Sequence, residues 1–233
     1  EVILIGAGPI GLEMASVLKR AGMDYLHFDA GQIGETLMKW PRGTLFYSSP
    51  EWIAIAGIPI HSPEQFRITG EQYLAYLRQV TETLDLPVHT YERITGISGR
   101  KGAFTVETER RGEARSYECG NIILATGGLD RPRFLGVPGE DLPHVSHYFV
   151  EPHRYFRQNL LIIGGRNSAV EAAVRSWRAG ARVSLSYRRG EIDEKTVLSR
   201  LHLEVSLLIE KGKIDFYPHT EPVRFGPRSA TLR

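Results

Sequence analysis

Near its start the chain reads Val2-Ile3-Leu4-Ile5-Gly6-Ala7-Gly8-Pro9-Ile10-Gly11. The apolar run Val2–Ile5 is typical of a strand buried on both faces, and the glycines after it form a G-x-G-x-x-G turn. A helical pattern then extends to Gly22, and a second strand, Tyr25–Phe28, ends at an acid, Asp29. A helix N-terminus can bind a pyrophosphate, and an acid about 20 residues further on can accept hydrogen bonds from ribose hydroxyls. This stretch therefore predicts a dinucleotide-binding unit.

The three glycines of the turn are expected to have different roles. Gly6 permits the tight turn, Gly8 lets the backbone approach the pyrophosphate, and Gly11 lets helix and strand pack closely. The spacing alone is a weak signal, but here strand, helix and distal acid are all in register. The residues expected to bind this first dinucleotide are Gly6, Gly8, Pro9, Ile10, Gly11, Asp29 and Ala30.

The composition is that of an ordinary globular protein. The 233 residues are 42% hydrophobic and 24% charged, enough for one large domain or two small ones. A formal charge of +2 is too small to indicate nucleic acid or an anionic membrane as a partner. No apolar run approaches the roughly 18 residues of a membrane span. A single cysteine, Cys119, and the absence of a visible signal peptide at Glu1 lead us to expect a cytoplasmic protein.

The middle of the chain predicts a loop, a helix and a small sheet. Residues 30–69 are rich in loop formers and carry aromatic side chains, so they form either a wall around a flat ring system or a loop packed on its own side chains. The pattern over 70–84 predicts an amphipathic helix. Strand candidates at 88–91, 94–97, 103–109 and 114–119 predict an antiparallel β-meander. The aromatic residues of the loop are Trp40, Phe46, Tyr47, Trp52 and Phe66.

Residues 121–128 indicate a buried strand that ends in small residues. Small residues at a strand end let another backbone or a ligand come close. Since a dinucleotide-binding unit precedes this strand, we expect Thr126 and Gly127 to close over the same ligand.

Residues 130–152 contain four prolines and are expected to be a linker. His144, His147 and His153 lie in or beside this stretch. Because no carboxylate or cysteine set accompanies them at ligand-like spacing, we expect structural roles for them and no metal site.

The opening pattern then repeats. A strand at 160–163 is followed by Gly164-Gly165-Arg166-Asn167-Ser168-Ala169, a helix at 170–179 and a strand ending in Tyr187-Arg188-Arg189. Asn167 and Ser168 can serve the helix N-terminus, and Arg166 replaces the middle glycine. Arginines at this register can bind a 2′-phosphate, although they can also be solvated surface, so we favour an NADPH site. Its expected residues are Gly164, Gly165, Arg166, Asn167, Ser168, Tyr187, Arg188 and Arg189.

Two such units predict an α/β protein with two Rossmann-like, three-layer ββα domains, the first carrying the inserted antiparallel meander. We assign residues 1–129 to FAD and residues 130–233, linker included, to NADPH, with hydride transfer from nicotinamide to flavin. A helix at 198–210 and strands at 214–217, 222–225 and from 230 complete the chain. It ends within the last strand, so we expect a fragment that lacks a C-terminal part of the FAD domain.

The chain resembles the flavoprotein reductases of the thioredoxin-reductase-like group, and within them it is most similar to the bacillithiol disulfide reductase-like family. The resemblance implies FAD on the first turn with Asp29 and Thr126-Gly127, NADPH on the second turn with Arg188 and Arg189, a homodimer, and a C-terminal segment that returns to the FAD domain. The matching stretches are Gly6-Ala7-Gly8-Pro9-Ile10-Gly11-Leu12, Phe46-Tyr47-Ser48-Ser49, Ala125-Thr126-Gly127, Gly136-Val137-Pro138-Gly139-Glu140-Asp141-Leu142-Pro143, His147-Tyr148-Phe149, Ile163-Gly164-Gly165-Arg166-Asn167-Ser168 and Tyr187-Arg188.

Two positions depart from these families. The Cys-x-x-Cys of thioredoxin reductases is absent from 147–152, and Ile10 stands where bacillithiol disulfide reductases carry a cysteine. Cys119 lies just before the Ala125-Thr126-Gly127 strand, where we expect a structural role for it, and no catalytic residue is assigned. We therefore predict an NADPH-dependent FAD oxidoreductase without an enzyme dithiol, whose external acceptor is a small disulfide, a quinone or a redox protein. The alternatives are a flavin monooxygenase, although Glu140 stands where its fingerprint requires histidine, and a non-catalytic dinucleotide-binding redox sensor.

Overall fold

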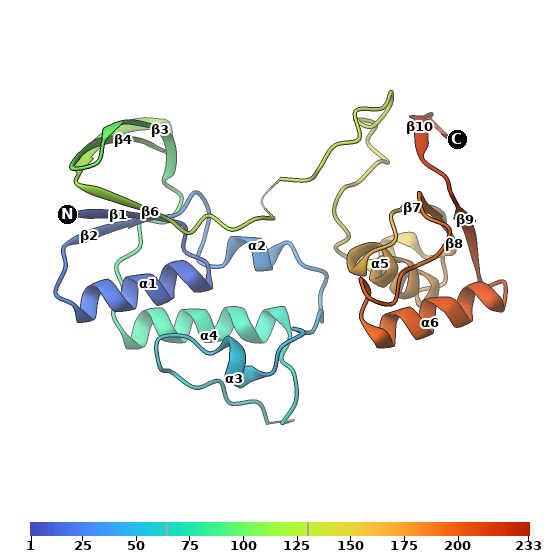
Figure 1. The fold of residues 1–233 in the computed structure, drawn as a ribbon, viewed down its shortest axis with the longest axis horizontal. Coiled ribbons are helices and arrows are strands. Elements are labelled where there is room, and N and C mark those ends of the chain that lie inside the picture. The colour runs from blue at the N-terminus through green and yellow to red at the C-terminus, as the bar shows by residue number, and fades with distance from the viewer. Residues whose placement is uncertain (64, 130) are drawn as a thin grey trace. The chain divides into compact units, whose positions relative to one another are not determined.

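The computed structural model describes residues 1–63, 65–129 and 131–233. They form two compact units, Glu1–Arg131 and Pro132–Arg233, which are described one at a time (Figure 1).

The first unit is a three-layer arrangement around a small parallel sheet. Its sheet has the strand order β2-β1-β6. Figure 1 shows helices α1 and α4 on one face of this sheet and the antiparallel meander β3-β4-β5 on the other. The elements are β1 (Val2–Ile5), α1 (Pro9–Arg20), β2 (Tyr25–Phe28), α2 (Glu35–Met38), α3 (Pro50–Ile53), α4 (Gly70–Thr83), β3 (Arg93–Arg100), β4 (Ala103–Arg110), β5 (Glu113–Cys119) and β6 (Asn121–Leu124).

Strand β1 is buried on both faces, as its apolar run predicts. Alternate residues face opposite layers because side chains alternate along a strand. Leu4 packs in the cluster that contains Leu12 of α1 and Leu77 of α4. Ile3 packs with Val106 of the meander. The β-turn-α unit therefore forms the centre of this unit, with a core on either side.

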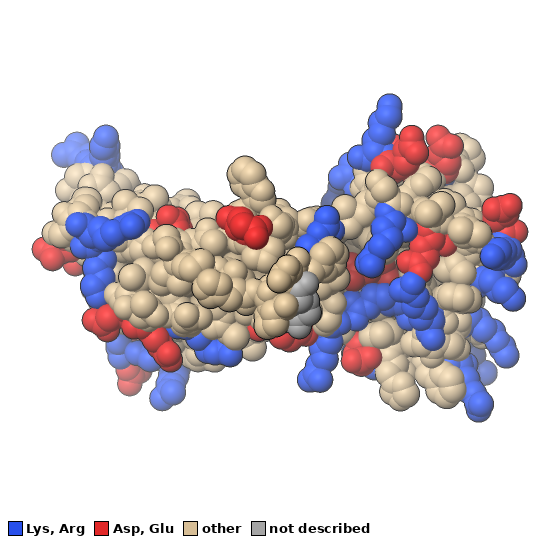
Figure 2. Space-filling model, turned by 90° about the horizontal axis from the view of Figure 1, so that it is seen from below, with Lys and Arg blue, Asp and Glu red and all other residues tan. Residues whose placement is uncertain are grey.

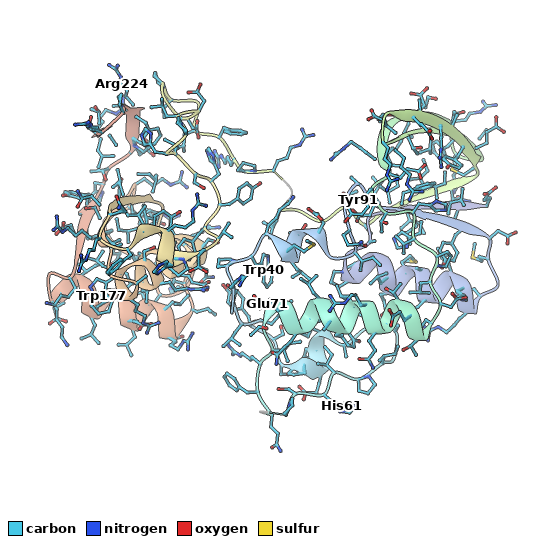
Figure 3. All side chains as sticks on the ribbon, turned by 180° about the vertical axis from the view of Figure 1, so that it is seen from behind. Trp40, His61, Glu71, Tyr91, Trp177 and Arg224 are labelled. Carbon is cyan, nitrogen blue, oxygen red and sulfur yellow. The ribbon has the colours of Figure 1, made fainter. Side chains whose placement is uncertain are left out.

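Helix α4 forms where the sequence predicts it and holds part of the preceding loop. Thr69 and Gln72 form a capping box at its N-terminus. The Phe46 ring lies 5.0 Å from Trp40 and 4.6 Å from Tyr73 of α4. Trp40 is labelled in Figure 3 beside the first turn of this helix. Part of the aromatic loop is thus packed on the unit's own side chains, whereas Tyr47, Trp52 and Phe66 are exposed.

Two expectations for this unit are wrong. Residues 88–91 form no strand; only a single bridge joins His89 to Phe28, and the backbone turns at Tyr91, whose φ is +57°. Strand β6 is not fully buried, and Leu124 is 67% exposed. The reason is its place: β6 pairs with β1 and is an edge strand among the described residues.

The second unit repeats the parallel β-turn-α arrangement. Its main sheet has the order β7-β8-β9, and β10 pairs with β11 in a separate antiparallel ribbon. Helix α5 begins three residues before the predicted start, at Asn167. The elements are η1 (Pro152–Tyr155), β7 (Asn159–Ile163), α5 (Asn167–Arg178), β8 (Arg182–Tyr187), α6 (Ser199–Glu210), β9 (Ile214–Pro218), β10 (Pro222–Phe225) and β11 (Ala230–Leu232).

The proline-rich stretch before η1 packs on the ribbon β10-β11 and is more than a connecting segment. The Phe225 amide donates to the Pro138 carbonyl at 2.8 Å, and a His144 ring nitrogen lies 3.0 Å from the Gly226 carbonyl oxygen. Gly139, with φ +81°, lets this stretch approach the Phe225 carbonyl. Residues 138–144 therefore belong structurally to the second unit.

No helix in the described part of the chain is long and apolar enough to cross a membrane.

Candidate dinucleotide-binding sites

The first glycine turn leaves space for a ligand at one position only. A Cβ atom on Gly6 would lie 2.3 Å from the Ala125 carbonyl oxygen, and one on Gly11 would lie 1.8 Å from the Gly6 carbonyl oxygen. A Cβ atom on Gly8 would meet no heavy atom within 4 Å. Gly6 and Gly11 are thus required by backbone packing, whereas the space at Gly8 suits a group such as a pyrophosphate.

Helix α1 starts directly behind this space. Gly8 is its N-cap without a side-chain cap, and Pro9 occupies the first turn. Ile10 is 70% exposed on the same turn. Uncapped amides at the start of a helix, together with the positive end of its dipole, favour an anion. The turn therefore fits a dinucleotide phosphate.

Asp29 follows β2 and faces the turn. Its Oδ2 accepts a hydrogen bond from the Ala7 amide at 2.6 Å, and its Oδ1 accepts one from the Gly31 amide at 2.8 Å. Each carboxylate oxygen can accept more than one hydrogen bond, so capacity remains for ribose hydroxyls. Ala30 lies between Asp29 and Gly31 in the sequence, and it has no side chain beyond Cβ that could keep a ribose away from the carboxylate.

The third segment of the first site follows β6. The Ala125 amide donates to the Ile5 carbonyl at 2.7 Å, which sets Thr126 and Gly127 beside the glycine turn. Strand β1 lies between β2 and β6, and all three are parallel. Ligands of open parallel sheets bind at the carboxyl ends where the strand order reverses, and the three predicted segments meet at this edge.

The second turn is built differently. Gly165 is buried against Tyr187, because a Cβ atom there would lie 2.4 Å from the tyrosine ring. Arg166 is exposed and forms the N-cap of α5 without a side-chain cap. The Asn167 side chain instead accepts from the Leu198 amide at 2.8 Å, so it does not cap α5 as expected. Ser168 is exposed in the first turn of the helix.

Hydrogen-bond register aligns the two turns. The Gly6 amide donates to the Phe28 carbonyl at 2.7 Å, and the Gly164 amide donates to the Ser186 carbonyl at 2.9 Å. By this register Asp29 corresponds to Tyr187, and the residue after it, Ala30, corresponds to Arg188. The acid of the first site is therefore replaced by a buried tyrosine followed by two exposed arginines.

The arginine turn borders an open hollow of about 480 Å³ lined by Arg189, Gly190, Glu191 and Asp193. The Arg189 guanidinium lies 3.8 Å from the Asp193 carboxylate. Lys and Arg outnumber Asp and Glu in the second unit, and many of them lie on the face seen in Figure 2. The hollow itself carries two carboxylates, Glu191 and Asp193, beside Arg189, so a phosphorylated ligand would have to compete with Asp193 for that guanidinium.

Glu140 holds together part of the linker, residues 135–147. Its carboxylate accepts from the Leu135 amide at 2.8 Å and the Gly136 amide at 2.7 Å, and it lies 2.9 Å from His147 Nε2. The hydrogen bond from Leu135, followed by that from His147, lowers the pKa of Glu140 to about 2. The side chain therefore holds a loop of the second unit in one conformation.

Replacing Glu140 with glutamine is expected to destabilise the protein only while the native carboxylate is ionised. A carboxyl whose folded pKa lies below its usual 4.5 stabilises the fold above that pH and loses this contribution as pH falls toward 2. The urea midpoint of Glu140→Gln should be lower than that of wild type at pH 7, and the two should converge between about pH 4.5 and 2. Glu118→Gln, at an exposed site on β5, is the control. A difference that stays constant down to pH 2 would contradict this assignment.

Cys119 lies at the end of β5 and is buried in the cluster between sheet and meander. Burial raises the pKa of its thiol, which keeps it protonated and poorly nucleophilic.

Among the described residues no group of three His, Cys, Asp or Glu side chains could hold a metal ion. His147 pairs with Glu140, and His153 stacks on Phe156.

The sequence arguments overlooked one buried side chain of the first site. His27 is fully buried in β2, and its Nε2 lies 2.8 Å from the Gly6 carbonyl oxygen. The available signal was a polar residue within the apolar strand Tyr25–Phe28, directly before the acid.

Two glycine turns, each between a parallel strand and a helix, are the arrangement typical of proteins with two dinucleotide-binding units. Residues 3–222 match the pyridine nucleotide-disulphide oxidoreductase family, and the chain belongs to this family.

Individual relatives support the same classification. Over 192 residues the chain is 36% identical to bacilliredoxin reductase Bdr of Bacillus subtilis (strain 168), covering 82% of this chain and 58% of that protein. It is 25% identical over 194 residues to a ferredoxin–NADP reductase of Ignicoccus hospitalis, covering 57% of that protein. The structure of bacillithiol disulfide reductase Bdr (YpdA) from Bacillus cereus superposes with a TM-score of 0.96 at 33% identity, over all of this chain and 71% of that one. The chain spans less than two thirds of these curated relatives.

Proposed function

We propose that the protein is an NADPH-dependent FAD oxidoreductase that passes electrons to an external acceptor. FAD binds at the first turn and NADPH at the second. The observation that carries this proposal is the difference in charge at the ends of the second strands: Asp29 follows β2, whereas at the aligned place after β8 the acid is replaced by Tyr187, with Arg188 and Arg189 next to it. An acid favours free ribose hydroxyls, and arginine favours a 2′-phosphate.

Different residues of each site bind different parts of the dinucleotide. At the first site the amides at the start of α1 face the pyrophosphate across the open position at Gly8, and Asp29 orients a ribose. Thr126 and Gly127 flank the flavin end. At the second site Gly164–Ser168 bind the pyrophosphate of NADPH, with Arg166 adding a positive charge. Bound FAD supplies the capacity to accept a hydride and release electrons.

The acceptor meets the flavin directly. Residues 1–233 contain one cysteine, Cys119, which is buried and has a raised thiol pKa, so no thiol of this part of the chain is assigned to the electron transfer. Similarity to a bacillithiol disulfide reductase supports a small disulfide as the acceptor, and similarity to a bacilliredoxin reductase and to a ferredoxin–NADP reductase supports a redox protein. The proposal includes FAD and NADPH domains divided near residue 130. It also includes a cytoplasmic location, which rests on the single cysteine, and a homodimer, which rests on the family resemblance.

The test is an anaerobic titration of the full-length protein. We expect a bound flavin whose visible absorption bleaches faster with NADPH than with NADH. A yellow protein that neither nucleotide bleaches would rule out a reductase, and a protein that cannot take up FAD would overturn the first site. A hydroperoxy-flavin in oxygenated buffer would identify a monooxygenase instead.

The substitution Cys119→Ala tests whether this thiol takes part in the reaction. Cys119→Ala should reduce the free energy of unfolding by about 1 kcal/mol, because a small buried side chain is truncated. The rates of flavin reduction by NADPH and of reoxidation by a small disulfide should stay unchanged. Stopped-flow absorbance measures both rates, and loss of the reoxidation step alone would place Cys119 in the reaction.

A further inference from the structure

We infer that His27 is a positioning residue for the first dinucleotide, because it fixes the Gly6–Ala7 peptide and, through that peptide, the carboxylate of Asp29. This inference rests on the proposed binding of FAD at the first turn. It assigns a role in cofactor affinity to a side chain that lies beneath the turn.

The contact between His27 and Gly6 has one possible polarity. The Gly6 carbonyl can only accept, so His27 Nε2, at 2.8 Å, carries the proton. The ring is fully buried, and burial lowers the pKa of His27. It is therefore a neutral donor, and its Nδ1 has no hydrogen-bond partner among the described residues. A buried imidazole in this state satisfies one backbone carbonyl.

The peptide links this donor to the ribose-binding acid. In a planar trans peptide the C=O and N–H groups point in opposite directions. The Gly6 carbonyl accepts from His27, and the Ala7 amide on the other side donates to Asp29 Oδ2 at 2.6 Å. Successive hydrogen bonds polarise one another. The donor at His27 thus holds Asp29 and the start of the glycine turn in one arrangement.

The second turn shows that this fold does not need a histidine here. His27 pairs with Leu4 in the first sheet, and Leu185 pairs with Ile162 at the corresponding register of the second. Leu185 is also fully buried. Leucine is thus sufficient to fill this core position in a β-turn-α unit. Core packing alone therefore does not explain a histidine at position 27.

The two turns also differ in how closely the helix approaches. In the first, a Cβ atom on Gly11 would lie 1.8 Å from the Gly6 carbonyl oxygen and 3.2 Å from His27 Nε2. In the second, Ala169 occupies the corresponding position, and its own Cβ fits there. The carbonyl of Gly6 is therefore enclosed by α1 and β2, where a lost donor leaves it unsatisfied.

The test compares side chains that can and cannot reach the carbonyl. A glutamine amide nitrogen occupies roughly the place of His Nε2, and an asparagine amide nitrogen that of Nδ1. FAD affinity of the full-length protein, measured by quenching of flavin fluorescence, should fall roughly 10- to 100-fold in His27→Leu and His27→Asn. His27→Gln should stay within roughly threefold of wild type. His153→Leu, at an exposed site in the second unit, should have no effect.

Each outcome separates this inference from the proposed function. Equal FAD affinity in His27→Gln and His27→Asn would overturn the role of Nε2, even if His27→Leu fails to fold. Wild-type protein that binds no FAD would instead overturn the proposed function. NADP⁺ affinity at the second turn should be unchanged in all three His27 variants, and a parallel loss there would show that the substitutions act through overall stability only.

Discussion

Replacing Gly11 with alanine is expected to abolish flavin binding and to destabilise the first unit. The added Cβ atom would lie 1.8 Å from the Gly6 carbonyl oxygen, a backbone atom that cannot move aside. Helix α1 must then separate from β1, which costs about 1–3 kcal/mol, as overpacked cores typically do. Because the glycine turn moves with the helix, FAD affinity should fall by at least about 100-fold, or roughly 3 kcal/mol of binding free energy. Thermal unfolding and flavin fluorescence measure the two effects.

Gly8→Ala is the matched variant, and it separates binding from folding. Gly8 has φ −76°, and an added Cβ atom would meet no protein atom within 4 Å. The apoprotein should therefore unfold at the wild-type temperature, whereas FAD affinity falls because the methyl group occupies the pyrophosphate's place. Wild-type FAD affinity in Gly8→Ala would show that the phosphates bind elsewhere. Wild-type stability in Gly11→Ala would contradict the close packing.

Local patterns made much of this fold predictable. The run Val2–Ile5 predicts a strand buried on both faces because each of its residues is apolar, and the structure confirms this. The repeat at residues 160–187 is recognisable from the same order of strand, turn, helix and strand. The antiparallel meander follows from alternating residues and glycine turns, and β4 and β5 confirm it. In each case the deciding signal lies within one continuous stretch of the sequence.

The failures depend on contacts between distant residues. Asn167 looks like a helix cap, but its side-chain oxygen accepts a hydrogen bond from the amide of Leu198, 31 residues away. Leu124 looks buried, and its exposure depends on which strands flank β6. Glu140 looked like a failed fingerprint position, and its role emerges only from two backbone amides and His147. Sequence spacing does not show which partner a polar side chain reaches.

Removing the Arg188 guanidinium is expected to abolish most of the preference for NADPH over NADH. Register places Arg188 one position beyond the site that corresponds to Asp29, and its side chain is exposed. A hydrogen bond between ionised partners contributes about 1.5–3 kcal/mol, so Arg188→Ala should raise KM for NADPH about 10- to 100-fold. KM for NADH, which lacks the 2′-phosphate, should change little. Anaerobic flavin reduction at varied nucleotide concentration measures both.

Arg189 should contribute less than Arg188, because its guanidinium already lies 3.8 Å from the Asp193 carboxylate. A phosphate would compete with that carboxylate for the same donors, so Arg189→Ala should raise KM for NADPH only a few-fold. Arg182→Ala, at an exposed position at the start of β8, removes the same charge at the other end of the strand that precedes Arg188 and should leave the preference intact. If the double variant Arg188→Ala with Arg189→Ala keeps the parent preference, the 2′-phosphate is not bound at this turn. A loss in Arg182→Ala as large as in Arg188→Ala would mean that net charge, and not a specific contact, attracts NADPH.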